Sequence, residues 1–195
     1  MSKVPTFFAA LAVLLLAACY PPTTTHPVGS TVGQKLDPVL VGLWKGTPTN
    51  KDERGSYYHF LPMLDGTVRV VIVQGGDKPD ADVILVKATT TMLGKNRFMN
   101  AQLVTSEGKP AEGSPASTVP VLYKLDAKGA MTISLMDEAA VKDAIKAGKI
   151  QGTVEKGDYG DAVITADPAT LDKFMQSPAA LAMFAKPFVT LRKME

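Results

Sequence analysis

Between residues 39 and 135 the chain alternates short runs of β-branched and aromatic residues with turns rich in Gly, Asp, Asn and Pro. Within several runs apolar and polar side chains alternate, which predicts strands with one buried face. Short turns join antiparallel neighbours. Because sheets twist and free edges need protection, we expect an antiparallel meander that curls into a barrel or half-barrel. Seven strands are expected, over residues 39–47, 56–61, 68–73, 82–91, 97–104, 119–125 and 131–135.

The last third of the chain carries helix signals instead. Three helices are expected, each after a capping Asp or Ser. They begin at Glu138, Pro168 and Pro178, directly after Asp137, Asp167 and Ser177. Two weaker strands and a closing strand are expected near residues 151–155, 161–165 and 188–192. The predicted fold class is therefore mainly β with C-terminal helices (α+β), in a single domain of residues 36–195.

Residues 1–18 have the pattern of a secretory signal peptide. Lys3 is followed by an apolar run that ends in small residues. That run is too short to span a bilayer comfortably as a helix. We therefore expect this segment to be removed, and it plays no part in the predicted fold.

The end of the same segment, Leu16-Ala17-Ala18-Cys19, resembles the lipobox of bacterial lipoproteins. The resemblance implies that the Cys19 thiol receives a diacylglycerol, that a peptidase cuts before it, and that the new N-terminus is acylated. Two or more acyl chains give stable membrane anchoring. In Gram-negative lipoproteins an aspartate after the cysteine favours retention at the inner membrane. Tyr20 at this position implies the outer membrane, with the domain facing the periplasm.

The segment of residues 19–35 that follows the cleavage site is rich in Pro, Thr and Gly and has almost no apolar periodicity. Such a sequence buries too little surface to offset its chain entropy. We expect the lipidated cysteine to be followed by a flexible tether that holds the domain off the membrane.

Gly42-Leu43-Trp44 lies in the first expected strand and resembles the Gly-x-Trp motif that opens lipocalins and other calycins. In that family the tryptophan plugs one end of the barrel, and an arginine from the last strand packs across it. The resemblance implies these roles for Trp44 and Arg192. The chain departs from lipocalins in its additional helices and in having no Thr-Asp-Tyr motif.

Later segments are similar, in their order, to a diffuse group of largely uncharacterised bacterial envelope proteins of the calycin type. The similarity rests on short motifs at Arg97–Asn100, Tyr123–Asp126, Leu135–Glu138, Ile164–Asp167 and Phe184–Pro187. It implies a fold and brings no activity with it.

Composition excludes several classes of function. The one cysteine cannot form a disulfide within the chain or a multi-thiolate metal site. A net charge of +2 over 195 residues, without a basic cluster, argues against nucleic-acid binding. His59 is the one histidine of the domain, and we expect it to be partly buried in a packing role. With no Gly-x-Ser-x-Gly motif and no phosphate-binding glycine loop, we expect no enzyme activity, metal or cofactor.

Candidate binding residues lie on two of the expected strands. Tyr58 and Phe60 are candidates for a pocket on the second strand. Phe98 and Asn100 alternate with residues that can face the core, so they are expected on a surface, or in a pocket if the sheet curls around them.

Two hypotheses for function follow. The first is a non-enzymatic module that binds a small apolar ligand or a lipid in the mouth of the barrel. The alternative is an accessory subunit of an envelope complex that acts through protein–protein contacts. A deep apolar cavity would favour the first, and a filled barrel with exposed apolar surface would favour the second.

The lipobox generates a direct prediction for Cys19. The Cys19→Ser variant should remain an uncleaved precursor without acyl chains, because the hydroxyl does not replace the thiol that accepts the diacylglycerol. Intact mass spectrometry of the membrane fraction checks this. If the variant carried the same acyl mass as the protein with Cys19, the lipoprotein assignment would be contradicted.

Overall fold

The computed structural model describes residues 21–30, 35–47, 55–74, 82–106, 109–110, 117–155 and 162–194. The lipobox, Tyr20 and the expected signal peptide lie outside these ranges. No helix within them is long and apolar enough to cross a membrane.

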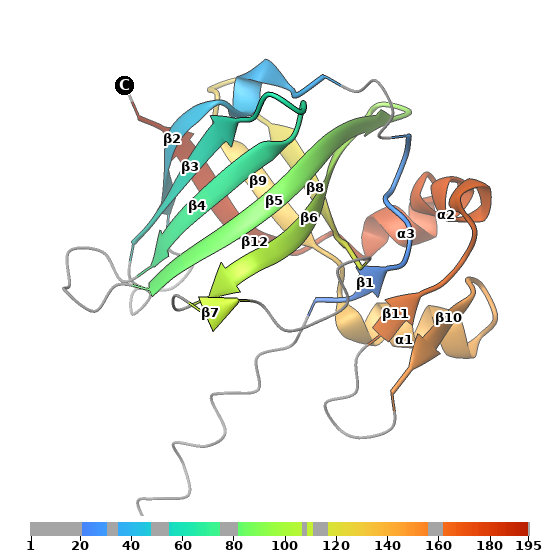
Figure 1. Ribbon diagram of the computed structural model, residues 1–195. Coiled ribbons are helices and arrows are strands. Elements are labelled where there is room, and N and C mark those ends of the chain that lie inside the picture. The colour runs from blue at the N-terminus through green and yellow to red at the C-terminus, as the bar shows by residue number, and fades with distance from the viewer. Residues whose placement is uncertain are drawn as a thin grey trace, which may run out of the picture.

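Eight antiparallel strands form a closed barrel (Figure 1). Each barrel strand pairs with the next one along the chain, and the last strand returns to pair with the first, which closes the ring. The barrel strands are β2 (Gly42–Thr47), β3 (Ser56–Pro62), β4 (Val68–Gln74), β5 (Asp82–Leu93), β6 (Asn96–Ser106), β8 (Val119–Leu125), β9 (Met131–Leu135) and β12 (Pro187–Lys193). A short strand, β7 (Lys109–Pro110), pairs with the end of β6. The predicted meander and its closure into a barrel are confirmed.

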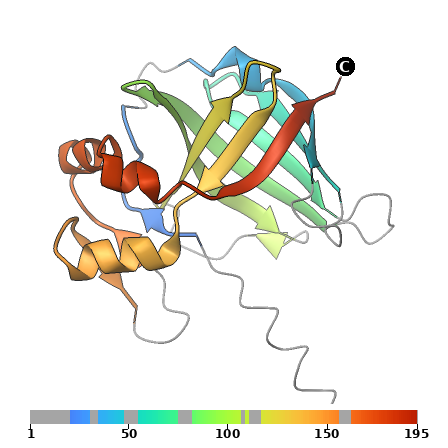
Figure 2. The same cartoon turned by 180° about the vertical axis from the view of Figure 1, so that it is seen from behind.

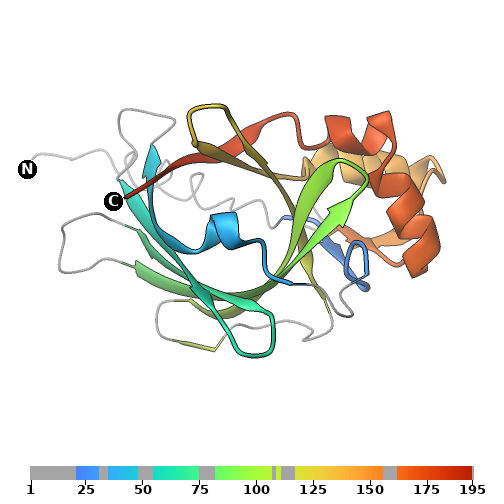
Figure 3. The ribbon, with the colours of Figure 1, turned by 90° about the horizontal axis from the view of Figure 1, so that it is seen from above.

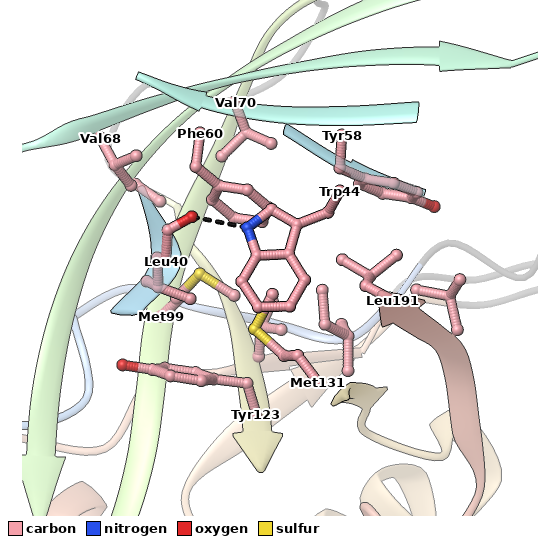
Figure 4. Packing of buried hydrophobic residues seen from close by; sticks show 14 residues of the cluster. Leu40, Trp44, Tyr58, Phe60, Val68, Val70, Met99, Tyr123, Met131 and Leu191 are labelled. Atoms are coloured by element: carbon pink, nitrogen blue, oxygen red, sulfur yellow. Dashed lines mark hydrogen bonds between the residues drawn. The ribbon is translucent and has the colours of Figure 1, made fainter. Parts of the chain in front are cut away.

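Alternate side chains of the strands point into the barrel and fill it (Figure 4). The interior holds fourteen buried apolar residues, four of which are aromatic: Trp44, Tyr58, Phe60 and Tyr123. Removing a large apolar side chain from water contributes about 1.5–3 kcal/mol. The interior of the barrel is therefore a hydrophobic core of the domain.

One end of the barrel, here called the lid end, is closed by the 3-10 turn η2 (Pro38–Leu40). Figure 3 shows this turn lying across the ring of strands. The strand expected over residues 39–47 begins only at Gly42. Asp37 accepts a hydrogen bond from the Val39 N–H at 3.1 Å and so caps a helical turn, and Pro38 has no N–H to give to a strand ladder.

Beside the barrel lies a second layer of three helices (Figure 2), which are α1 (Glu138–Lys146), α2 (Pro168–Met175) and α3 (Pro178–Ala182). Their N-caps are the predicted residues Asp137, Asp167 and Ser177, whose side chains accept backbone N–H groups. A small sheet of β10 (Gly152–Val154), β11 (Ala162–Ile164) and β1 (Thr23–Thr24) belongs to this layer. A second buried cluster joins the layer to the outer face of β6 and β8 through Phe98 and Leu122.

Residues 22–30, here called the strap, run between the barrel and the helical layer (Figures 1 and 3). Within the strap, β1 pairs in parallel with β11, and Val28 is completely buried. The Asn100 side chain donates to the Val28 carbonyl oxygen at 3.0 Å and accepts the Val28 N–H at 2.7 Å. The prediction of a flexible tether is wrong for these residues. Their own sequence has little apolar surface, but their backbone groups find partners on β11, β6 and α2.

The contacts of the strap predict the effect of the Asn100→Ala substitution. It removes both hydrogen bonds to Val28 and leaves a buried N–H and C=O without those partners, so we expect a loss of about 1–3 kcal/mol in the free energy of unfolding. Urea unfolding measures it. Lys124→Ala, an exposed position on the adjoining strand β8, is the control and should change the free energy by less than about 0.5 kcal/mol. Equal effects of the two substitutions would contradict the role given to Asn100.

Candidate functional site

The side chain of Trp44 lies inside the barrel at the lid end, where it is 1% exposed. Its indole Nε1–H donates to the carbonyl oxygen of Leu40 at 2.8 Å (Figure 4). A buried indole N–H needs such a partner, because leaving it unpaired in an apolar interior costs free energy. Trp44 and η2 therefore close this end of the barrel together.

Arg192 does not pack across Trp44, and this prediction was wrong by one residue. In the pairing of β12 with β2, Lys193 stands opposite Trp44 and Arg192 stands opposite Lys45. Because successive side chains of a strand point to opposite faces, Arg192 points away from the interior. The Lys193 Nζ lies 5.5 Å from the centre of a Trp44 ring, so lysine supplies the cation.

A polar cluster around Asp37 fastens the lid to the strands beneath it. The Tyr123 hydroxyl donates to Asp37 Oδ2 at 3.0 Å, and Arg97 Nε lies 3.4 Å from the same oxygen. The Asp37 N–H donates to the Thr90 hydroxyl oxygen at 3.2 Å. Burial and the neighbouring Asp37 carboxylate raise the pKa of Tyr123. The phenol stays protonated and donating, so these contacts hold the lid in place.

Tyr58 and Phe60 lie in the core of the barrel. Both side chains point inward from β3 and are buried, Tyr58 at 5% and Phe60 at 1% exposure. They belong to the fourteen-residue cluster that fills the interior (Figure 4). Burial raises the pKa of the Tyr58 phenol. Among the described residues, apolar side chains of the protein itself occupy the interior that Tyr58 and Phe60 face.

Phe98 and Asn100 lie on the outer face of β6, but neither is exposed. The Phe98 ring meets the Phe184 ring edge to face, with centroids 5.9 Å apart and planes at 71°. Asn100 is covered by the strap. The expected exposed face is therefore an interface within the domain, because the strap and the helical layer cover it.

The helical layer carries a groove of about 510 Å³ between α1 and the segment that runs from α3 to Lys186. On α1 its lining residues recur at helical spacing, which places them on one face. Six of its lining residues are alanines, namely Ala140, Ala144, Ala147, Ala179, Ala182 and Ala185. Phe174 and Met183 complete the apolar part.

Charged groups border this groove. Asp137 and Lys186 approach to 3.8 Å, and Asp143 and Lys149 also line it. This groove was not predicted from the sequence. Its one signal in the sequence is the repeat of alanine on one face of the first predicted helix, and alanine carries no chemical signature of a ligand.

His59 points outward from β3 and is exposed, so the expected partial burial is wrong. The alternation that buries Tyr58 and Phe60 turns His59 to the other face. Within the residues that the structure describes, no three His, Cys, Asp or Glu side chains are grouped to hold a metal ion.

Comparisons with known proteins give no relative from which a function could be transferred. No protein-family model, curated protein or solved structure matches this chain. Its function is therefore inferred from its own residues and their arrangement.

The stacking of Lys193 on Trp44 can be tested against the role that the family resemblance implies for Arg192. Lys193→Ala should lower the free energy of unfolding by about 0.5–1 kcal/mol, because it removes the cation from the indole face. Arg192→Ala, one residue away but pointing outward, is the matched control and should change it by less than about 0.5 kcal/mol. Urea unfolding followed by Trp44 fluorescence measures both, and a larger loss for Arg192→Ala would overturn this placement.

Proposed function

We propose that this protein is a non-enzymatic lipoprotein of the bacterial envelope that binds a partner protein through the groove between α1 and α3. Acyl chains on Cys19 anchor it in the outer membrane, and the domain faces the periplasm. The observation that carries the proposal is the filled barrel: fourteen buried apolar residues occupy its interior, so binding is assigned to the outside of the fold.

The lining of the groove favours a polypeptide as its occupant. Alanine side chains give a shallow apolar floor, into which a larger apolar side chain of a partner can insert. Asp143, Lys149 and Lys186 stand around this floor, where they can pair with backbone or charged groups of a bound segment. A groove with an apolar centre and a polar rim has the anatomy of a protein–protein interface.

A small apolar molecule is the second candidate, and one observation favours it. The volume of the groove, about 510 Å³, falls within the range of small-molecule sites. The ligand would then bind on the helical layer and outside the barrel.

Photo-crosslinking in the intact cell tests the proposal. A photoreactive amino acid is placed at Ala182, which is exposed and lines the groove, or at Ala139, which is exposed on α1 and does not line it. We expect a discrete adduct with one envelope protein from Ala182 and none from Ala139. Because both positions are exposed, neither replacement should disturb the fold.

Two results would count against a protein partner. Equal adducts from Ala182 and Ala139 would show contact without a groove-specific interface. A small molecule that accompanies the purified protein in native mass spectrometry, and is lost when Ala182→Trp fills the groove, would establish the second candidate instead.

A further inference from the structure

The strap fixes the chain three residues after the proposed lipidation site. Pro22 is buried, and Thr24 pairs with Ile164 and bridges to Thr118. An extended chain spans at most about 3.6 Å per residue, so Cys19 lies within about 11 Å of Pro22. If Cys19 is acylated as proposed above, this part of the domain is held at the membrane surface.

The strap enters at one end of the barrel, here called the anchor end. Thr118, which bridges to Thr24, directly precedes β8, and Tyr123 near the far end of β8 contacts Asp37 beside the lid. At about 3.4 Å per residue the seven residues of β8 extend about 24 Å. The three-residue step from Cys19 to Pro22 is therefore too short to bring the lid end to the membrane, but it is long enough to bring the anchor end there.

Exposed apolar side chains alone do not choose between the two ends. At the anchor end, where β5 begins and β6 ends, Val83, Leu103 and Val104 are 43%, 50% and 45% exposed. At the lid end, Met63 and Leu64 in the turn after β3 and Met92 near the end of β5 are exposed as well. The short chain between Cys19 and Pro22 determines which end faces the membrane, because it brings the anchor end to the bilayer.

The anchor end also has the chemistry of a surface that rests on lipid. Lys109 on β7 is exposed and pairs with Ser106 at the end of β6, next to the apolar pair Leu103 and Val104. Apolar side chains favour the boundary between headgroups and acyl chains, and a lysine beside them favours lipid phosphates.

We propose that the anchor end of the barrel, with Leu103, Val104 and Lys109, is a membrane-contact surface. The barrel then stands on the bilayer with this end down. This inference rests on the proposed acylation of Cys19. The lid end, with Trp44 inside it and Leu64 at its rim, then points away from the bilayer. β1 of the strap pairs with β11, on which α1 packs, so a partner bound in the groove beside α1 meets the domain close to where the strap leaves the membrane.

Depth measurements on the acylated full chain test this orientation. The protein is reconstituted in vesicles of phosphatidylethanolamine and phosphatidylglycerol, a fraction of which carry a nitroxide near the headgroup. Because Cys19 is the one native cysteine and is consumed by acylation, a fluorophore on Leu103→Cys or on Leu64→Cys labels a single position. We expect the nitroxide lipids to quench the label at position 103 several-fold more than the label at position 64.

Equal quenching at the two positions, or stronger quenching at position 64, would overturn the orientation. A label on Val104→Cys repeats the test should the Leu103 variant fold poorly. Intact mass spectrometry of the same samples reports acylation of Cys19 separately. Failure of the lipoprotein proposal therefore appears as missing acyl mass, whereas failure of the orientation appears as the wrong quenching pattern on a correctly acylated chain.

Discussion

The structure depends on the burial of Trp44 in a barrel whose interior is filled by apolar side chains. A buried indole N–H requires an acceptor, and the Leu40 carbonyl oxygen supplies it from a turn that lies across the end of the strands. That turn is held in place by the contacts of Asp37 with Tyr123 and Thr90. One aromatic side chain thus links the closing of the barrel end, the position of the lid and the polar cluster that fastens it.

Because the barrel interior is filled, the proposed binding site lies on the outside of the fold. The outer face of β6, which an open barrel would leave to solvent, is covered by the strap and by the helical layer, with Phe98 and Asn100 in the contact. The groove on the helical layer remains accessible. Since the strap also leads to the proposed lipid anchor, the segment that attaches the domain to the membrane is the same segment that joins its two layers.

Much of the fold could be predicted from the sequence because its signals are local. Alternation placed the strands, and the capping residues Asp137, Asp167 and Ser177 marked the helix starts. The strap was missed because its order comes from partners such as Asn100 and β11, which lie far away in the sequence. The family resemblance implied an arginine at Trp44, but the register of β12 places Lys193 opposite Trp44, and a shift of one residue turns Arg192 to the other face of the strand. The groove was not predicted because alanine side chains have no distinctive chemistry.

The central claim, that the barrel interior is filled around Trp44, is tested most directly by the fluorescence of that residue, the one tryptophan in the chain. The account predicts an emission typical of an apolar environment, protection from water-soluble quenchers, and no change when fatty acids or phospholipids are added. An emission typical of water, or a shift on addition of lipid, would show that the interior is open to ligands and would contradict the account.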